Sequence, residues 1–227
     1  MDFAFLLECF EKLLAGVPIT LGLSLFSCAI GLVLASVICA MRMSNKPWLD
    51  YPARTFVAVF RGTPLLVQLF VIYYGLGQFS WLRESFAWPY LREAYWCVLA
   101  ALALNTAAYT SEILRGGINS VQQGQIEAGL SVGLRKDQIW RYVIIPQACR
   151  QMLPAYGNEI ILQIKSTSLA SIVTLMEVTG IAAKLVSQTY RPIEVFICAG
   201  ALYLLFNFIV TRAVTLMEFR FTRGMRR

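Results

Sequence analysis

Four stretches of the chain contain no Asp, Glu, Lys or Arg: residues 13–41, 62–82, 94–111 and 195–211. An α-helix rises about 1.5 Å per residue, so roughly 20 apolar residues cross the hydrocarbon core of a bilayer. The first two stretches reach that length, and the other two reach it when polar ends are included. A fifth apolar stretch, 151–176, carries Glu159 and Lys165. The pattern predicts an all-α integral membrane protein with about five transmembrane helices.

Composition separates this chain from a soluble protein with buried helices. The sequence is 58% hydrophobic and only 15% charged, whereas soluble domains average about 45–50% and 25%. We find no linker, low-complexity tract or internal repeat, so residues 1–227 are expected to form a single transmembrane domain. Residues 1–16 lack the positive start and cleavage site of a signal peptide. Their apolar residues recur at helical spacing, which predicts a short interfacial helix.

The distribution of basic residues predicts the orientation. We place the spans near 17–41, 54–78, 95–115, 150–176 and 193–217. With the N-terminus outside, 14 of the 20 Lys and Arg residues fall on the inner side and five on the outer side, and Lys165 lies within a span. Cytoplasmic loops of membrane proteins carry this excess, so we expect an N-out, C-in arrangement. The net charge of +7 then reflects topology and does not indicate nucleic-acid binding.

The residues for metal or nucleotide chemistry are missing from the sequence. There is no histidine, and the six cysteines form no Cys-x-x-Cys pair, which disfavours a zinc site. The string Lys165-Ser166-Thr167 lacks the preceding glycine of a phosphate-binding loop. We therefore expect no metal or cofactor in this chain and no enzymatic activity of its own.

Residues 127–146, EAGLSVGLRKDQIWRYVIIP, lie in the polar loop 116–149, which the orientation places in the cytoplasm. Within them, GLSVG matches both a hydrolase nucleophile elbow and a contact between membrane helices. The elbow needs a general base, normally histidine, and the contact needs an apolar helix that the flanking charges exclude. What remains is a short helix that is either a solvated connector or a docking site for a cytoplasmic partner. We expect a second helix at 136–145, which Pro146 ends.

This segment resembles the EAA loop of permease subunits in ABC importers. That pattern is Glu-Ala-Ala, three residues, Gly, nine residues, Ile, one residue and Leu-Pro. Glu127, Ala128, Gly133 and Pro146 match it in type and spacing, while Gly129 replaces the third-position alanine. Segments 60–70, 105–121, 153–173 and 189–196 resemble the polar amino-acid branch, with its histidine-, octopine- and nopaline-type permeases. The likeness covers nearly the whole chain.

The resemblance implies a type I ABC importer permease fold with a cytoplasmic coupling helix, in the bacterial cytoplasmic (inner) membrane. It implies a second permease subunit, identical or paralogous, a pair of ATPase subunits that bind ATP and Mg²⁺, and an extracytoplasmic solute-binding protein. The expected function is ATP-driven import of polar or basic amino acids or opines by alternating access. The residues expected to couple the ATPase to transport are Glu127, Ala128, Gly129, Gly133 and Pro146.

Polar residues inside spans are costly and usually functional. On a helix with about 100° per residue, one face of the fourth span groups Asn158, Glu159, Gln163 and Lys165. The second span adds Arg61 and Gln68, and the third adds Asn105 and Glu112. The predicted substrate pathway comprises Asn158, Glu159, Gln163, Lys165, Arg61 and Glu112, with Glu159 contacting a cationic substrate. Alternatively, these charges neutralise one another and hold the helices together.

Two other functions remain open from the sequence. The chain could be a scaffolding permease subunit whose paralogous partner holds the substrate site. It could also be a channel or receptor subunit, which would need neither the docking loop nor ATP. Co-purification with an ATPase subunit separates a permease from a channel or receptor.

Overall fold

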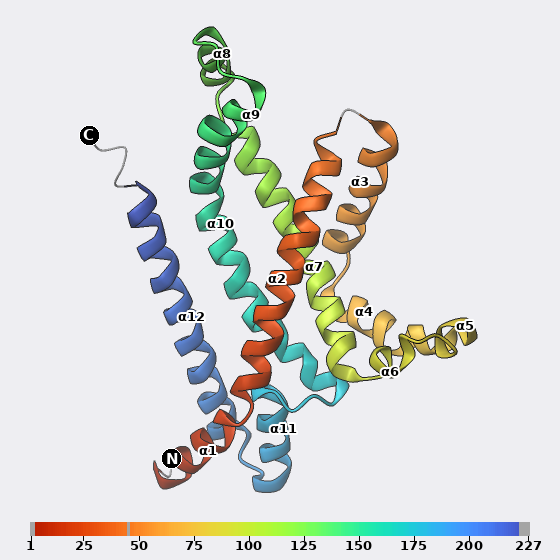
Figure 1. Ribbon diagram of the computed structural model, residues 1–227. Coiled ribbons are helices and arrows are strands. Elements are labelled where there is room, and N and C mark those ends of the chain that lie inside the picture. Colours follow the sequence, from red (N-terminus) through yellow and green to blue (C-terminus); the bar gives the residue numbers. More distant parts are fainter. Residues whose placement is uncertain (1–2, 45, 223–227) are drawn as a thin grey trace.

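The computed structural model describes residues 3–44 and 46–222, and these residues contain no strand. Its long helices are α2 (Val17–Arg42), α7 (Ala94–Asn119), α10 (Ile145–Ser166) and α12 (Pro192–Thr222). They form an elongated bundle in which α7 packs along α2, and α10 packs against α7 and α12 (Figure 1). Three helices are long and apolar enough to cross a membrane, and two bent helix pairs raise the number of candidate spans to five. This agrees with the predicted number.

Helices α2 and α7 are in close contact at Gly31. A Cβ atom at this position would collide with Thr106 Cγ2 and would lie 3.3 Å from the carbonyl oxygen of Ala103. Small residues commonly allow such contact between helices in a bilayer. The close approach brings the polar side chains of α2 and α7 within reach of α10.

The predicted second span is broken. Helix α3 (Pro47–Gly62) is followed by α4 (Leu65–Phe70) after a bend of 107°, where one span near 54–78 was predicted. Thr63 and Pro64 are extended, with ψ angles of 147° and 135°. The residue before a proline is driven out of the helical region, so the sequence Thr63-Pro64 explains the break.

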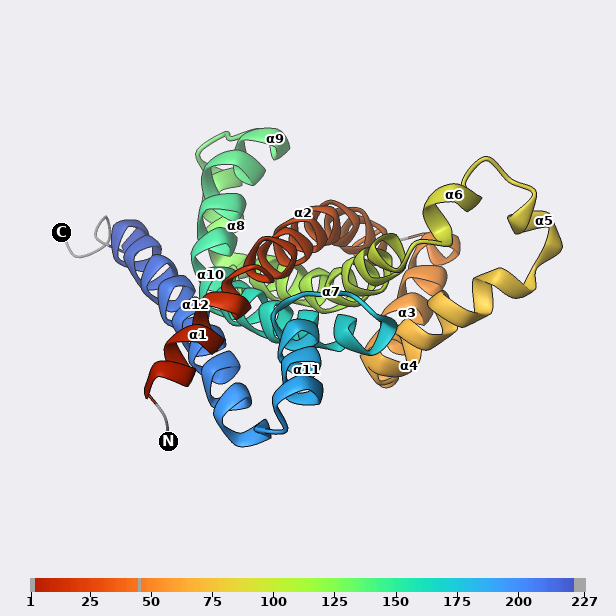
Figure 2. The same cartoon turned by 90° about the horizontal axis from the view of Figure 1, so that it is seen from below.

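After the bend, the chain leads away from the bundle. The π-helical turn η1 (Val71–Gly75) and the 3₁₀ turn η2 (Leu76–Gln78) connect α4 to the short helices α5 (Ser80–Arg83) and α6 (Trp88–Leu91). These helices project from the side of the bundle (Figures 1 and 2). Their aromatic residues Trp81 and Tyr90 are exposed, as is typical of residues at a membrane surface.

The second bent pair includes the fourth span. Helix α10 runs through the turn η4 (Thr167–Val173) and, after a bend of 47°, is followed by α11 (Val178–Thr189). Residues 177–192 were expected to be a connection, so this helix was not predicted. Helix α1 (Phe3–Leu14), the predicted interfacial helix, contacts α11 and α12 at this end of the bundle (Figure 1).

The polar loop lies at the opposite end. It contains α8 (Gln123–Ser131), α9 (Lys136–Ile139) and the π-helical turn η3 (Trp140–Ile144). The prediction that Pro146 ends a helix is wrong, because the helical path continues from Lys136 to Val173. Pro146 lies in the first turn of α10, where its missing N–H group is tolerated after the widened turn η3.

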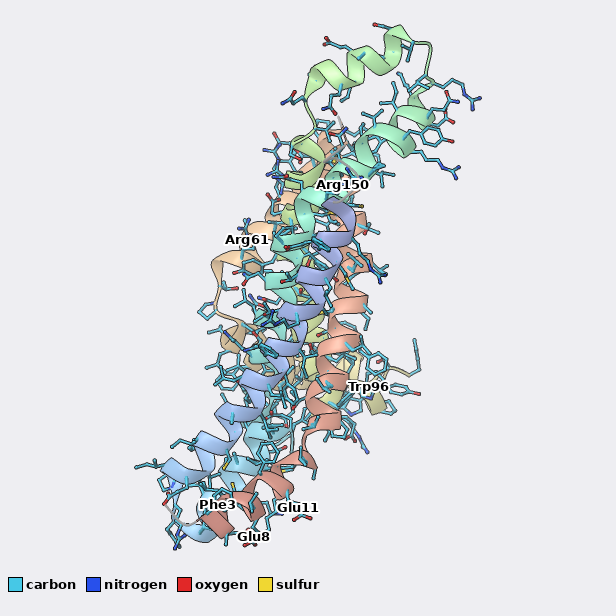
Figure 3. The ribbon with its side chains drawn as sticks, turned by 90° about the vertical axis from the view of Figure 1, so that its left-hand side faces the viewer. Phe3, Glu8, Glu11, Arg61, Trp96 and Arg150 are labelled. Carbon is cyan, nitrogen blue, oxygen red and sulfur yellow. The ribbon has the colours of Figure 1, made fainter. Side chains whose placement is uncertain are left out.

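The structure separates the residues that the predicted orientation assigns to opposite sides. Arg150 and the loop lie toward one end, whereas Phe3, Glu8 and Glu11 lie at the other (Figure 3). The end of α2 at Arg42 and the start of α3 also lie at the loop end (Figure 1). These two groups thus lie at opposite ends of the bundle, and the N-out, C-in orientation stays a prediction.

Candidate functional site

A polar cleft of about 310 Å³ lies where α7 and α10 face the bend between α3 and α4. Helix α7 contributes Asn105 and Tyr109, α10 contributes Glu159 and Gln163, and the bend contributes Thr63. The break in the second span thus supplies one wall of the cleft. A straight helix would not offer this exposed turn of backbone.

Gln68 holds the bend in place. Its Nε2 donates hydrogen bonds to the carbonyl oxygen of Phe60 at 2.8 Å and to Thr63 Oγ1 at 2.9 Å. Asn105 Nδ2 donates to Gln68 Oε1 at 2.9 Å, which ties the bend to α7. The last carbonyl groups of a helix lack intrahelical partners, so the amide of Gln68 replaces a bond that the break at Pro64 removes.

Glu159 and Gln163 place hydrogen-bonding groups deep in the bundle. Thr106 Oγ1 donates to Glu159 Oε1 at 2.9 Å, and the Glu159 side chain is only 7% exposed. Gln163 Nε2 donates to Ser27 Oγ at 2.8 Å and to the Leu102 carbonyl oxygen at 3.1 Å. Buried polar groups are costly unless they find such partners. These bonds fix both side chains beside the cleft.

Arg61 provides a positive charge beside the cleft. Its guanidinium lies 5.2 Å from the centre of the Tyr109 ring, in a cation–π arrangement. Tyr109 lines the cleft, so the guanidinium lies beside it. The cleft therefore combines a carboxyl group, two amides and a nearby guanidinium.

The structure divides the predicted polar face of α10 in two. Glu159 and Gln163 are buried toward α2 and α7, whereas Asn158 and Lys165 are exposed on another side of the helix. Helices α2 and α7 cover only part of the predicted polar face, so the rest of that face stays exposed.

Glu112 is not part of the cleft lining but belongs to an ion cluster near the loop end. It pairs with Arg42 and, at 2.7 Å, with Arg115. Asp50 Oδ1 lies 3.5 Å from Arg42 Nε, and Asp50 Oδ2 lies 2.7 Å from Arg54 Nε. The cluster joins α2, α3 and α7. The contacts of Glu112 therefore fit the alternative interpretation from the sequence, in which opposite charges hold the helices together.

Gly133 ends α8 through its backbone conformation. Its φ angle is +83°, in the left-handed region where residues with a Cβ are strained. The N–H of Gly133 donates to the Leu130 carbonyl oxygen and that of Leu134 to the Gly129 carbonyl oxygen, both at 3.0 Å. These are the two bonds of a Schellman motif. A Cβ at position 133 would meet nothing within 4 Å, so the turn itself calls for glycine here.

Of the other coupling residues predicted on α8, one is buried in a helix contact and two are exposed. Gly129 is buried, and a Cβ there would lie 3.4 Å from Ile139, so it allows α8 to pack on α9. Glu127 and Ala128 are exposed on α8. Exposed apolar side chains at this tip are Leu130 (51%) and Val132 (78%). An apolar group exposed beside charged residues is typical of an interaction surface.

Glu177 is a buried residue that the sequence did not single out. It begins α11, where its side-chain oxygens accept hydrogen bonds from the N–H groups of Thr179 (2.9 Å) and Gly180 (2.7 Å). Tyr203 of α12 donates its hydroxyl at 2.8 Å. A Cβ at Gly16 would lie 2.6 Å from the backbone of Glu177. Glutamate is not a usual N-cap residue, so no sequence signal marked this position.

Residues 29–223 match the family described as "Binding-protein-dependent transport system inner membrane component". The chain is 61% identical over 217 residues to the octopine transport system permease protein OccM of Rhizobium meliloti, an alignment that covers 96% of this chain and 89% of the relative. It is 51% identical over 227 residues to the nopaline transport system permease protein NocM of Agrobacterium fabrum, covering 100% and 94%.

Solved structures share the fold. A crystal structure of an amino acid ABC transporter with histidines has a TM-score of 0.86 at 35% identity, covering 97% of this chain and 99% of the matched chain. The MetNI methionine ABC transporter, at 16% identity, matches with a TM-score of 0.67. The chain therefore belongs to the family of inner membrane components of binding-protein-dependent transport systems, with the type I permease fold predicted from its sequence.

Proposed function

We propose that this permease subunit imports basic amino acids or opines, and that its own cleft contacts the substrate. The observation that carries this proposal is Glu159, a buried carboxyl group on the cleft, held by Thr106 and facing a polar wall. A carboxylate in such a place would pair with the cationic group of the substrate. The names of the octopine, nopaline and histidine-type relatives support this substrate class.

Helix α10 offers a mechanical connection from the loop to the cleft. It continues the helical path that begins at Lys136, shortly after α8. It carries Glu159 about two turns and Gln163 about one turn before η4. A pair of ATPase subunits would bind α8, with ATP and Mg²⁺ held by those subunits. Closure of the pair would move α8, and α10 would transmit the motion to the cleft. Access would then alternate between the two sides of the membrane.

The exposed polar side of α10 supports a second permease subunit. Asn158 and Lys165 are exposed in this single chain, and polar side chains in a span rarely face lipid. Together with a second subunit, identical or paralogous, they would border a water-filled path. An extracytoplasmic solute-binding protein would deliver the substrate to this path.

Glu159→Gln tests the substrate contact. Glutamine keeps the size and the oxygen that accepts the Thr106 hydrogen bond but removes the negative charge. We expect uptake of a cationic substrate to fall about five- to ten-fold, the difference between a charged and a neutral hydrogen bond. The measurement is the initial rate of arginine or octopine uptake into proteoliposomes that contain the complete importer, with saturating binding protein. Glu84→Gln, at an exposed position, is the matched control.

A scaffolding role makes a different prediction. In that case Glu159→Gln would transport at the wild-type rate, while charge removal in the cleft of the paralogous subunit would abolish uptake. That pair of results would contradict a substrate contact in this chain and leave its place in the importer intact.

A further inference from the structure

A polar pocket of about 380 Å³ lies at the loop end of the bundle, between the end of α2 and the start of α3. Its lining includes Arg42, Ser44, Asp50, Tyr51 and Arg54. It is separate from the cleft and from the exposed tip of α8, so neither substrate contact nor ATPase docking accounts for it. The predicted orientation places this end at the cytoplasmic face of the membrane.

The ion cluster beside this pocket carries an excess positive charge. Three guanidinium groups, from Arg42, Arg54 and Arg115, share the two carboxylates of Asp50 and Glu112. Arg42 Nε is buried and lies 3.5 Å from Asp50 Oδ1, whereas the Arg54 side chain is 62% exposed. The cluster thus carries one guanidinium charge in excess, and the exposed Arg54 can donate N–H groups to a monoanionic phosphodiester group.

An apolar groove adjoins the polar pocket. It has a volume of about 470 Å³ between α2, α7, η3 and α10, and Met43 lines both the groove and the pocket. The other walls of the groove include Cys39, Leu114, Trp140 and Met152. These residues lie in or beside the spans, at the level of the cytoplasmic leaflet in the predicted orientation.

Aromatic and basic side chains stand near the mouth of the pocket. Trp48 and Tyr51 are 68% and 69% exposed, and the ammonium group of Lys46 lies 5.8 Å from the Trp48 ring centre. Exposed Trp and Tyr residues collect at the headgroup level of a bilayer. They locate the pocket at the boundary between lipid and water.

We propose that the pocket and groove together bind one anionic phospholipid of the cytoplasmic leaflet. The phosphodiester lies against Arg42 and Arg54, and one acyl chain follows the groove past Met43. A polar, cation-rich pocket that continues into an apolar groove matches the two parts of a phospholipid. Basic pockets between helices on the cytoplasmic side are suited to such headgroups. This inference rests on the orientation and does not depend on the substrate.

Native mass spectrometry of the purified complete importer tests the site. After mild delipidation and addition of equal phosphatidylglycerol and phosphatidylethanolamine, we expect the wild type to retain phosphatidylglycerol preferentially. Arg54→Gln should lower that retention about five-fold, the effect of one basic group near an anionic headgroup, and Arg54→Lys should restore most of it. Ala40→Trp, which adds bulk at an exposed position in the groove, should lower retention of both lipids.

The matched control is Arg212→Gln, which removes an exposed arginine from α12 outside the pocket and should leave lipid retention unchanged. Equal retention of both lipids by the wild type, or wild-type retention by Arg54→Gln, would overturn the proposal. Displacement of phosphatidylglycerol by millimolar inorganic phosphate would show a general anion site and would also contradict a lipid site. Each variant is first compared with the wild type in thermal unfolding, so that loss of lipid is not confused with misfolding.

Discussion

Replacing Gly133 with valine should reduce ATP-driven uptake by about 30-fold while leaving the helical bundle folded. The φ angle of +83° costs a β-branched residue about 2 kcal/mol or more, which corresponds to roughly a 30-fold loss of the correct turn. The turn fixes α8 against α9, so the proposed ATPase contact would lose its geometry. Substrate uptake and ATP hydrolysis are measured together in proteoliposomes, and thermal unfolding confirms that the bundle is intact.

Two further variants separate the backbone role of Gly133 from a steric one. Gly124→Val adds the same side chain to α8, where a Cβ meets nothing within 4 Å, and should transport at nearly the wild-type rate. Gly133→Asn should retain most activity, because asparagine tolerates a left-handed conformation. If asparagine were as harmful as valine at position 133, bulk against a partner, and not the turn, would explain the glycine.

Removing the side chain of Glu177 should destabilise the folded protein more than any other change considered. Glu177→Ala leaves the N–H groups of Thr179 and Gly180 without their acceptor. The hydroxyl of Tyr203 loses its bond to Glu177 but keeps its contact with Thr179 Oγ1 at 3.0 Å. At about 1 kcal/mol for each lost bond, the loss is about 2–3 kcal/mol, and the midpoint of thermal unfolding in detergent should fall by about 4–12 °C.

Single-group variants provide the comparison for Glu177. Tyr203→Phe removes the hydroxyl group and with it one of the three hydrogen bonds that Glu177 accepts, so it should cost about 1 kcal/mol. Glu11→Ala, at an exposed position at the same end of the bundle, should leave the midpoint unchanged. A midpoint for Glu177→Ala equal to that of Glu11→Ala would contradict the anchoring role of this residue.

The features of the fold that depend on hydrophobicity could be predicted from the sequence. Charge-free stretches predicted the spans, and α2 and α12 begin and end close to the predicted limits. Helix α1 was predicted from the spacing of its apolar residues. These elements follow from the need to satisfy backbone hydrogen bonds inside a membrane, which depends little on the rest of the fold.

The features that were missed depend on local backbone chemistry. Pro64 carried the signal for the 107° bend, but the apolar character of 62–82 favoured a continuous helix. Gly133 was predicted as a coupling residue, and its left-handed turn was not predicted, although a glycine just after a helix is typical of such a turn. For a proline or glycine in an otherwise regular pattern, the backbone conformation that the residue favours should therefore be considered before its contacts.

The candidate cleft could be predicted only in part. Glu159 and Gln163 were found because a polar side chain inside a span is costly. Their partners Ser27, Leu102 and Thr106 come from helices distant in sequence, and no local pattern links them. The split between Gln163 and the exposed Lys165 likewise depends on which neighbours cover α10.

The central claim is that this chain forms part of an ATP-driven importer for basic amino acids or opines. Its most direct test is accumulation of radiolabelled octopine and arginine in proteoliposomes. These would contain this permease, its sister subunit and the ATPase, with ATP inside and binding protein outside. We expect accumulation above the external concentration, and we expect it to stop when ATP is omitted or when this chain is left out. Equilibration without ATP, or undiminished accumulation without this chain, would contradict the claim.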